Sequence, residues 1–252
     1  MADGVSRFPT PWPPPASVLR SAGYWVPSWT CREAIRRLAR AVGNDRVVSP
    51  PPAPVSLHGS LVSLEPLTIS SVPALAAVGL HPELWRLQPR VIVSVADMRE
   101  YVEQALADHA RGVSLPFVIV RGEDRAVLGS TRFMEIAPEH RRLEIGATWL
   151  TPAAQRTGVN VEAKLLLLSH AFDAMGIQRV VLKTEATNTQ SRTAILALGA
   201  VEEGTFRRHL IAENGRMRDM TYFSILDSEW PSVRERLRAR LAQRRASAPK
   251  AE

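Results

Sequence analysis

A short polar loop stands between a strand-like run and a long helical run, and its residue types suit an anion. The loop consists of Gln155, Arg156, Thr157, Gly158, Val159 and Asn160. The first turn of a helix leaves backbone N–H groups without intrahelical partners, and the helix dipole adds positive potential there. Gly158 allows a ligand to approach the backbone closely, and Arg156 adds charge. The junction is therefore a candidate site for a phosphate or diphosphate group.

Other kinds of chemical site have no matching pattern. The chain contains neither the GxxxxGK[ST] pattern of a Walker loop nor the G-x-G-x-x-G pattern of a dinucleotide site. Its six histidines have no metal-ligand spacing, and its single cysteine, Cys31, rules out an intramolecular disulfide. No nucleophile-turn motif suggests a Ser-His-Asp triad. We therefore expect a site without a metal ion.

The order of motifs after the loop is more specific than the loop alone. The Q-R-x-G-x-N sequence of residues 155–160 is followed by a helical run, a strand-like run, Asn188-x-x-Ser191 and then Leu198-Gly199-Ala200. This combination resembles the GNAT acetyltransferases, in the branch similar to RimJ and RimL, and the resemblance covers residues 57–230. It implies an α/β GNAT fold: a mixed, mostly antiparallel sheet flanked by helices, with a splayed central strand pair. It also implies an N-acetyltransferase that uses acetyl-CoA as co-substrate and acetylates a primary amine by direct attack in a ternary complex.

The resemblance assigns the cofactor contacts residue by residue. Backbone amides of residues 155–160 would bind the diphosphate of coenzyme A, although the family usually has Gly or Ala where this chain has Asn160. The backbone at Trp149 and Leu150 would flank the pantetheine arm. Asn188 and Ser191 would begin a helix that faces the cofactor, and Asn188 is also a good N-cap residue in its own right.

Acetyl transfer to an amine requires a base, which the resemblance places on the strand beside the acetyl group. Glu144 is the candidate base, and Glu135 and Glu185 are weaker ones. Strict alternation puts Glu144 on the face opposite to one apolar row. That row consists of Leu143, Ile145, Ala147 and Trp149.

The leaving thiolate requires a proton donor. Many members of the family use a tyrosine at the position of Ile195, so that role is unfilled here. Ser191 is the nearest matched polar residue, and Tyr222 is a more distant alternative. His209, next to two arginines, would contact the acceptor without acting in catalysis, and His170 suits a partly buried helical position.

Hydrophobic periodicity predicts the elements that must position these residues. Strands are expected at 61–66, 116–121, 126–136, 141–150, 179–185, 200–211 and 217–226, and helices at 70–80, 97–111, 160–175 and 189–198. Gly176 and Gly199 would end the last two helices in a left-handed conformation. Val161, Leu165, Leu168, Phe172 and Met175 would form the buried stripe of helix 160–175. Asn214-Gly215 predicts a two-residue hairpin turn with positive φ at both positions.

The ends of the chain differ from the middle. Residues 1–56 hold ten of the 19 prolines and predict a flexible segment, and residues 231–252 predict a basic C-terminal tail, in which Val233, Leu237 and Leu241 suit an amphipathic helix. These two segments carry net charges of +4 and +5, whereas residues 57–230 carry −2. A field that would gather nucleic acid is therefore confined to the ends, and the middle is the expected acetyltransferase domain.

Several alternatives stay open at this stage. The acceptor is a protein N-terminus or a small-molecule amine, and a homodimer is compatible with either. Ile195 and Asn160 also suit an acyl-CoA-binding or regulatory module without turnover, and the basic ends suit a binder associated with ribosomes or nucleic acid. No run of 18 apolar residues and no signal-peptide pattern occurs, so we expect a cytoplasmic protein that does not enter a membrane.

Overall fold

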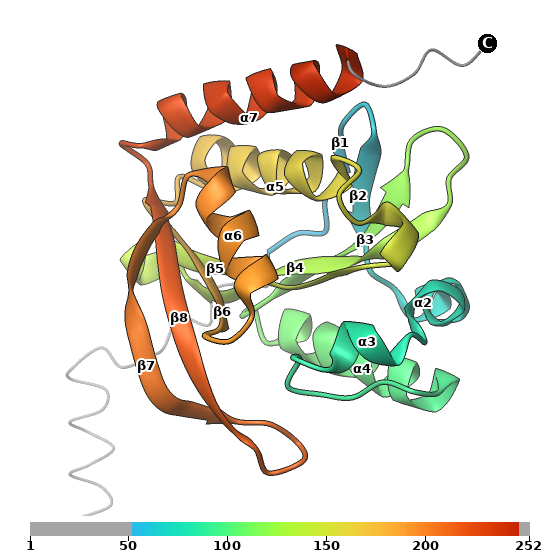
Figure 1. The fold of residues 1–252 in the computed structure, drawn as a ribbon. Helices are drawn as coiled ribbons and strands as arrows, with labels where there is room; N and C mark the ends of the chain where they lie inside the picture. Colours follow the sequence, from blue (N-terminus) through green and yellow to red (C-terminus); the bar gives the residue numbers. More distant parts are fainter. Residues whose placement is uncertain (1–51, 247–252) are drawn as a thin grey trace, which may run out of the picture. The chain divides into compact units, whose positions relative to one another are not determined.

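Eight strands form one sheet in the computed structural model, which describes residues 52–246. The sheet order is β1-β2-β3-β4-β5-β6-β8-β7 (Figure 1). The strands are β1 (Leu57–His58), β2 (Val62–Pro66), β3 (Leu115–Arg121), β4 (Val127–Ala137), β5 (Arg142–Leu150), β6 (Arg179–Glu185), β7 (Val201–Ile211) and β8 (Met217–Leu226). Every neighbouring pair is antiparallel except β5 and β6. The expected mixed, mostly antiparallel sheet is confirmed, and the proline-rich segment up to residue 51 lies outside the described residues.

Helices cover both faces of the sheet. They are α2 (Val72–Gly79), α3 (Pro82–Trp85), α4 (Val95–Ala110), α5 (Val159–Ser169), α6 (Thr189–Leu198) and α7 (Trp230–Ala246). The first three lie on one face, and α5, α6 and α7 lie on the other (Figure 1). All the predicted strands and helices are present, and three of them, at 179–185, 189–198 and 217–226, have the predicted bounds. No helix among residues 52–246 is long and apolar enough to cross a membrane.

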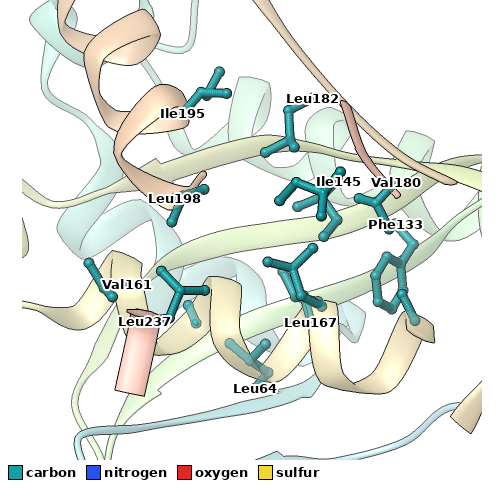
Figure 2. Packing of buried hydrophobic residues seen from close by; sticks show 14 of the residues in the cluster. Leu64, Phe133, Ile145, Val161, Leu167, Val180, Leu182, Ile195, Leu198 and Leu237 are labelled. Carbon is teal, nitrogen blue, oxygen red and sulfur yellow. The ribbon is translucent and has the colours of Figure 1, made fainter. Parts of the chain in front are cut away.

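The larger core lies between the sheet and the layer of α5, α6 and α7. Leu64, Phe133 and Ile145 enter it from the strands, and Leu167 and Leu237 enter it from the helices (Figure 2). A second cluster, which includes Trp85 and Met98, fills the space on the other face. Because successive strand residues point to opposite faces, a sheet covered on both sides buries nearly every residue of its central strands.

α5 has the buried stripe that its sequence predicts, with one change at its end. Val161, Leu168 and Phe172 are buried, whereas Leu165 and Met175 of the predicted stripe are only partly buried against the same core. The α-helix does not continue to residue 175, because His170–Ala174 forms a π-helical turn, in which the Met175 N–H donates to the carbonyl of His170, five residues earlier. Gly176 then ends the segment with a φ of +65°, as predicted for a left-handed stop.

A buried carboxylate fixes the start of α5 against a distant turn. Glu162 accepts hydrogen bonds from the backbone N–H groups of Ser60, Leu61 and Val62 at 3.1, 2.6 and 2.8 Å, and from the Ser60 hydroxyl at 2.7 Å. Hydrogen bonds to a charged acceptor are among the stronger ones in proteins. They therefore hold the first turn of α5, and the loop before it, in a defined position over the β1–β2 turn.

The β7–β8 hairpin forms as predicted, but its turn type differs. Gly215 has a φ of +78°, whereas Asn214 is absent from the residues with positive φ. The Gly215 N–H donates to the Ala212 carbonyl, and the Ala212 N–H donates to the Arg216 carbonyl. This pattern is a type I turn followed by one left-handed residue, so the prediction of a two-residue turn was wrong. The extra residue accommodates the right-handed twist of the two strands.

α7 is part of the core and not an exposed tail. Val233, Leu237 and Leu241 are all buried and belong to the same cluster as Leu167 of α5. Figure 1 shows α7 lying along α5 at the surface of the domain. The predicted amphipathic helix is confirmed, and its apolar face has a partner that periodicity alone does not reveal.

Candidate active site

The central strands β5 and β6 separate after a short paired segment. They pair in parallel only at Arg142–Arg179, Leu143–Val180 and Glu144–Val181. Beyond Glu144, the edge of β5 that faces β6 has no strand partner among the described residues. This opening is the splayed strand pair that the sequence predicts, and it leaves backbone groups available to a ligand.

Glu144 stands at the point where the two strands part. Its side chain is only 3% exposed, and Lys183 Nζ of β6 lies 2.6 Å from its Oε2. The same Nζ lies 2.8 Å from Oε1 of Glu135, a half-exposed residue at the bulged end of β4. Burial raises the pKa of Glu144 against the opposing effect of Lys183. A raised pKa makes this carboxylate a stronger base than an exposed glutamate.

Lys183 is a residue of this site that the sequence analysis missed. Burial opposes its charge, but Glu144 and Glu135 outweigh that effect, and the pKa of Lys183 is raised. The ammonium group also lies 5.7 Å from the ring centre of Tyr222. The alternation of β6 places Lys183 on the face opposite to Leu182, and this signal could have paired it with Glu144.

The other polar residues that the sequence analysis considered are each held by a different partner. Glu185 accepts hydrogen bonds from Arg216 and from Arg218, and the Arg216 guanidinium is the largest cause that lowers the pKa of Glu185 to about 2. A carboxylate held in this way is a poor base at neutral pH. Tyr222 and His209 hydrogen-bond each other at 2.8 Å on the open side of β7 and β8. Burial lowers the pKa of His170, which stacks on Phe133 in the core.

A bulge in β5 changes the predicted facing of Trp149. Ala147 has a φ of +46°, and the pairing with β4 shifts register between Ser130 and Arg132. Leu143 and Ile145 enter the core beneath α5, whereas Trp149 packs with Trp85 in the cluster beneath α4. The prediction of one continuous apolar face was therefore wrong beyond the bulge, because one extra residue inverts the alternation that follows it.

The end of β5 and the following loop are tied together. Gln155 donates from its side-chain amide to the Leu150 carbonyl at 3.2 Å, and the Thr157 hydroxyl donates to the Ala154 carbonyl at 2.7 Å. Arg156 and Gly158 have φ values of +63° and +105°. Gly158 is the N-cap of α5, and it provides no side chain to cap the helix.

Free backbone donors gather in this loop. Within residues 52–246, the N–H groups of Thr157, Gly158, Asn160 and Val161 donate to no other group. The Asn160 Oδ1 is buried and also lacks a partner among these residues. Unpaired donors at a helix start, with two residues of positive φ before it, fit the diphosphate of coenzyme A. Asn160 occupies the first turn beside these amides and adds a polar group of its own.

The start of α6 lies against the same loop. Gln190 Nε2 lies 3.5 Å from Gln155 Oε1, so the structure brings the two predicted cofactor segments together. Asn188 caps α6 by accepting a hydrogen bond from the Ser191 N–H at 3.0 Å. The Ser191 hydroxyl is partly exposed and makes no hydrogen bond to the described part of the chain. Ile195, at the position where many family members have a tyrosine, is an apolar residue buried in the core and cannot donate a proton to the thiolate.

A second lysine was not anticipated. Lys164 of α5 is 5% exposed, and burial lowers its pKa from 10.5 to about 7. Its Nζ donates to Thr148 Oγ1 at 2.5 Å, and Thr148 shares a hydrogen bond with Thr131 at 2.8 Å. No group of His, Cys, Asp and Glu residues among the described residues has the arrangement of a metal site.

Comparisons with known proteins agree with this geometry. Residues 62–201 match the family described as the acetyltransferase (GNAT) domain. The ribosomal-protein-serine acetyltransferase of Escherichia coli (strain K12) is 27% identical over 141 residues, which cover 56% of this chain and 77% of that protein.

Two solved structures are similar over most of the chain. A GCN5-related N-acetyltransferase from Brucella melitensis has a TM-score of 0.70 and 28% identity, and the match covers 80% of this chain and 89% of that one. Mycobacterium smegmatis RimJ in complex with CoA-disulfide has a TM-score of 0.63 and 26% identity, with 77% and 96% covered. The splayed strands, the open loop before α5 and these matches together show that the chain belongs to the GNAT acetyltransferase family, in its RimJ/RimL-like branch.

Proposed function

We propose that this acetyltransferase transfers the acetyl group of acetyl-CoA to the α-amino group of a protein N-terminus. The observation that carries the proposal is the buried carboxylate of Glu144, placed where β5 and β6 separate and paired with Lys183. The similarity to a ribosomal-protein-serine acetyltransferase favours a protein acceptor over a small-molecule amine. Phe206 of β7 is exposed and packs against Tyr222 of β8. An exposed apolar side chain at this end of the sheet favours an acceptor as large as a peptide.

The proposed roles follow from the burial and position of each group. The bound co-substrate supplies a thioester, whose carbonyl carbon is the electrophile. The loop at residues 155–160 holds its diphosphate through the unpaired amides, and the free edge of β5 beyond Glu144 offers backbone groups to the pantetheine arm. Glu144 takes a proton from the ammonium form of the acceptor, directly or through water, so that the neutral amine can attack.

Ser191 is the proposed proton donor. The amine nitrogen forms a bond to the thioester carbon, and as the carbon–sulfur bond breaks the Ser191 hydroxyl gives its proton to the leaving thiolate. Through solvent, Ser191 regains the proton that the acceptor nitrogen loses as it becomes an amide. The free hydroxyl at the first turn of α6, beside the cofactor loop, supports this role. The buried Ile195 leaves no tyrosine to compete for it.

The test is a thiol-release assay with peptides that differ at their first residues, together with small amines and peptides whose N-terminus is already blocked. We expect acetyl-CoA-dependent release with a subset of free N-termini, and mass spectrometry should locate the acetyl group on the α-amine. Release with small amines alone would contradict the protein acceptor. Binding of acetyl-CoA without release for any amine would instead support the regulatory module without turnover.

A further inference from the structure

Three arginines form a stripe on α7 at four-residue spacing. Arg236, Arg240 and Arg244 share one side of the helix, because four residues make slightly more than one turn. The Arg236 guanidinium packs against Gly199 at the end of α6, and Arg240 Nη1 donates to the Ala197 carbonyl at 3.2 Å. The stripe therefore begins at the C-terminal end of α6.

Arg236 and Arg240 lie where they can stabilise the C-terminal end of α6, but Arg244 hydrogen-bonds to a different segment. Carbonyl groups at the end of a helix lack intrahelical partners and carry negative partial charge, so cations stabilise them. Arg244, in contrast, donates from Nη1 to the Arg156 carbonyl at 2.7 Å. That carbonyl belongs to the loop before α5, where Arg156 has a left-handed backbone conformation.

Peptide geometry gives this bond a consequence for the loop. In a trans peptide the N–H points opposite to the carbonyl of the same unit. Since Arg244 of α7 binds the Arg156 carbonyl, the Thr157 N–H points away from α7. The Thr157 and Gly158 amides have no acceptor within residues 52–246. The Arg244 stem also runs beside Gly158, with its Cδ 3.6 Å from the place a Cβ would occupy there.

We infer that Arg244 is a positioning residue for acetyl-CoA, which holds the loop at residues 155–160 in the shape that presents its amides to the diphosphate. The inference rests on the proposed function, since it assumes that coenzyme A binds at this loop. α7 lies beyond residues 62–201, the part of the chain that the family match covers. The arginine would thus act on the site from a helix that lies outside the residues of the family match.

The experiment compares the full chain with Arg244→Ala. Calorimetry with coenzyme A should show about tenfold weaker binding, the loss expected when one hydrogen bond from a charged donor no longer orders the site. The KM for acetyl-CoA should rise by a similar factor, and kcat should stay close to that of the wild type. Arg244→Lys keeps a charged donor and should restore part of the affinity.

Three comparisons make the test specific. Arg238→Ala removes an exposed arginine of the same helix, which pairs with Glu235, and should leave binding unchanged. S-acetylpantetheine lacks the diphosphate, so the wild type and Arg244→Ala should use it equally well. Dephospho-coenzyme A keeps the diphosphate, so the difference between the two proteins should persist.

The outcomes separate the possible failures. Unchanged coenzyme A affinity in Arg244→Ala would overturn the inference, as would an equal loss with S-acetylpantetheine. A loss that vanishes with dephospho-coenzyme A would overturn it as well, because Arg244 would then act on the ribose phosphate. If the wild type itself binds no coenzyme A, the proposed function fails, and that result is distinct from a failure of Arg244 alone.

Discussion

Glu144 is almost completely removed from water, and a single lysine stands between it and Glu135. A buried carboxylate without a countercharge would be protonated, whereas one locked between two arginines would hardly bind a proton at all. Glu185 shows the second extreme, with its pKa lowered to about 2 by Arg216 and Arg218. Glu144 lies between these extremes, since burial raises its pKa while Lys183 stabilises its charge. A general base needs such a balance, because it must both take up and release a proton during the reaction.

Glu144→Gln keeps the size of the side chain and removes the base. We expect kcat/KM to fall by about 10²-fold, the usual contribution of a positioned general base, while acetyl-CoA affinity changes little. In the wild type the rate should rise with pH as Glu144 loses its proton, and the raised pKa moves this limb above the usual range of a glutamate. The deficit of the variant should shrink at higher pH, because more of the amine then arrives neutral. Steady-state kinetics across pH measures both effects.

Glu139→Gln serves as the control, because Glu139 is an exposed carboxylate near the start of the same strand. Its kinetics should match those of the wild type. A wild-type rate for Glu144→Gln at neutral pH would assign Glu144 to structure alone.

The elements of this fold were largely predictable, and the site that they build was only partly so. Hydrophobic periodicity predicted seven of the eight strands and five of the six α-helices of the described residues, since each buries one face or one stripe. It missed the two-residue β1 and the four-residue α3, which are too short to show a period. It failed at β5, where Ala147 inserts one residue and moves Trp149 to the other face. A bulge leaves no mark on composition, so alternation cannot reveal it.

The loop before α5 depends on the backbone freedom of Gly158, whose φ is +105°. Gly158→Val should weaken coenzyme A binding by at least tenfold, because a β-branched residue strongly disfavours this conformation and disturbs the amides around it. Calorimetry on the folded variant measures the loss. Gly215→Val introduces comparable strain in the β7–β8 turn, where nothing lies near the added side chain, and should keep the affinity. Equal binding by Gly158→Val and the wild type would show that the diphosphate lies elsewhere.

At the scale of the whole molecule, what the sequence could not reveal is contact between distant segments. The carboxylate of Glu162 reaches a turn about 100 residues earlier, and α7 covers α5 from the far end of the domain. Neither pairing has a local signature. The motifs that resemble a known family implied the topology, but they did not reveal that Lys183 pairs with Glu144, that Lys164 is buried, or that α7 packs on α5.

Leu237 tests whether α7 stabilises the whole domain. The side chain is fully buried between α7 and the rest of the larger core. Leu237→Ala should lower the free energy of unfolding by about 2–5 kcal/mol, the range for removing a buried leucine side chain. Urea denaturation measures this change, and Arg238→Ala on the exposed side of the helix should leave it within about 0.5 kcal/mol. Equal stability of the two variants would mean that α7 is detached in solution.

Lys164 gives stability a defined dependence on pH. Its pKa falls from 10.5 in the unfolded chain to about 7 in the folded one. Between these two pKa values Lys164 is protonated in the unfolded chain and neutral in the folded one. The free energy of unfolding therefore rises with pH across this window. Below pH 7 the folded protein has to bury a charged lysine, and the full cost of that burial is present. Lys164→Met should therefore stabilise the protein at pH 7, by about 2 kcal/mol, and the gain should shrink towards pH 10.

Thermal or urea unfolding at several pH values measures this trend. Lys183→Met is the matched comparison and should have the opposite effect at pH 7, because it leaves the buried Glu144 without its countercharge. A stabilisation by Lys164→Met that is independent of pH would contradict this prediction, because it would mean that Lys164 has the same pKa in the folded and the unfolded protein.

The position of α7 in the chain also bears on how the protein folds during synthesis. The helix follows every strand of the sheet, yet Val233, Leu237 and Leu241 complete the core over α5. While the ribosome is still producing these residues, the outer side of α5 has no cover, and the apolar surface that α7 will bury stays open to water and to other chains. The sheet can pair its strands early, but the domain closes only when its last helix emerges. Chaperones that bind apolar segments would therefore find their target late in translation, on the face that α7 finally covers.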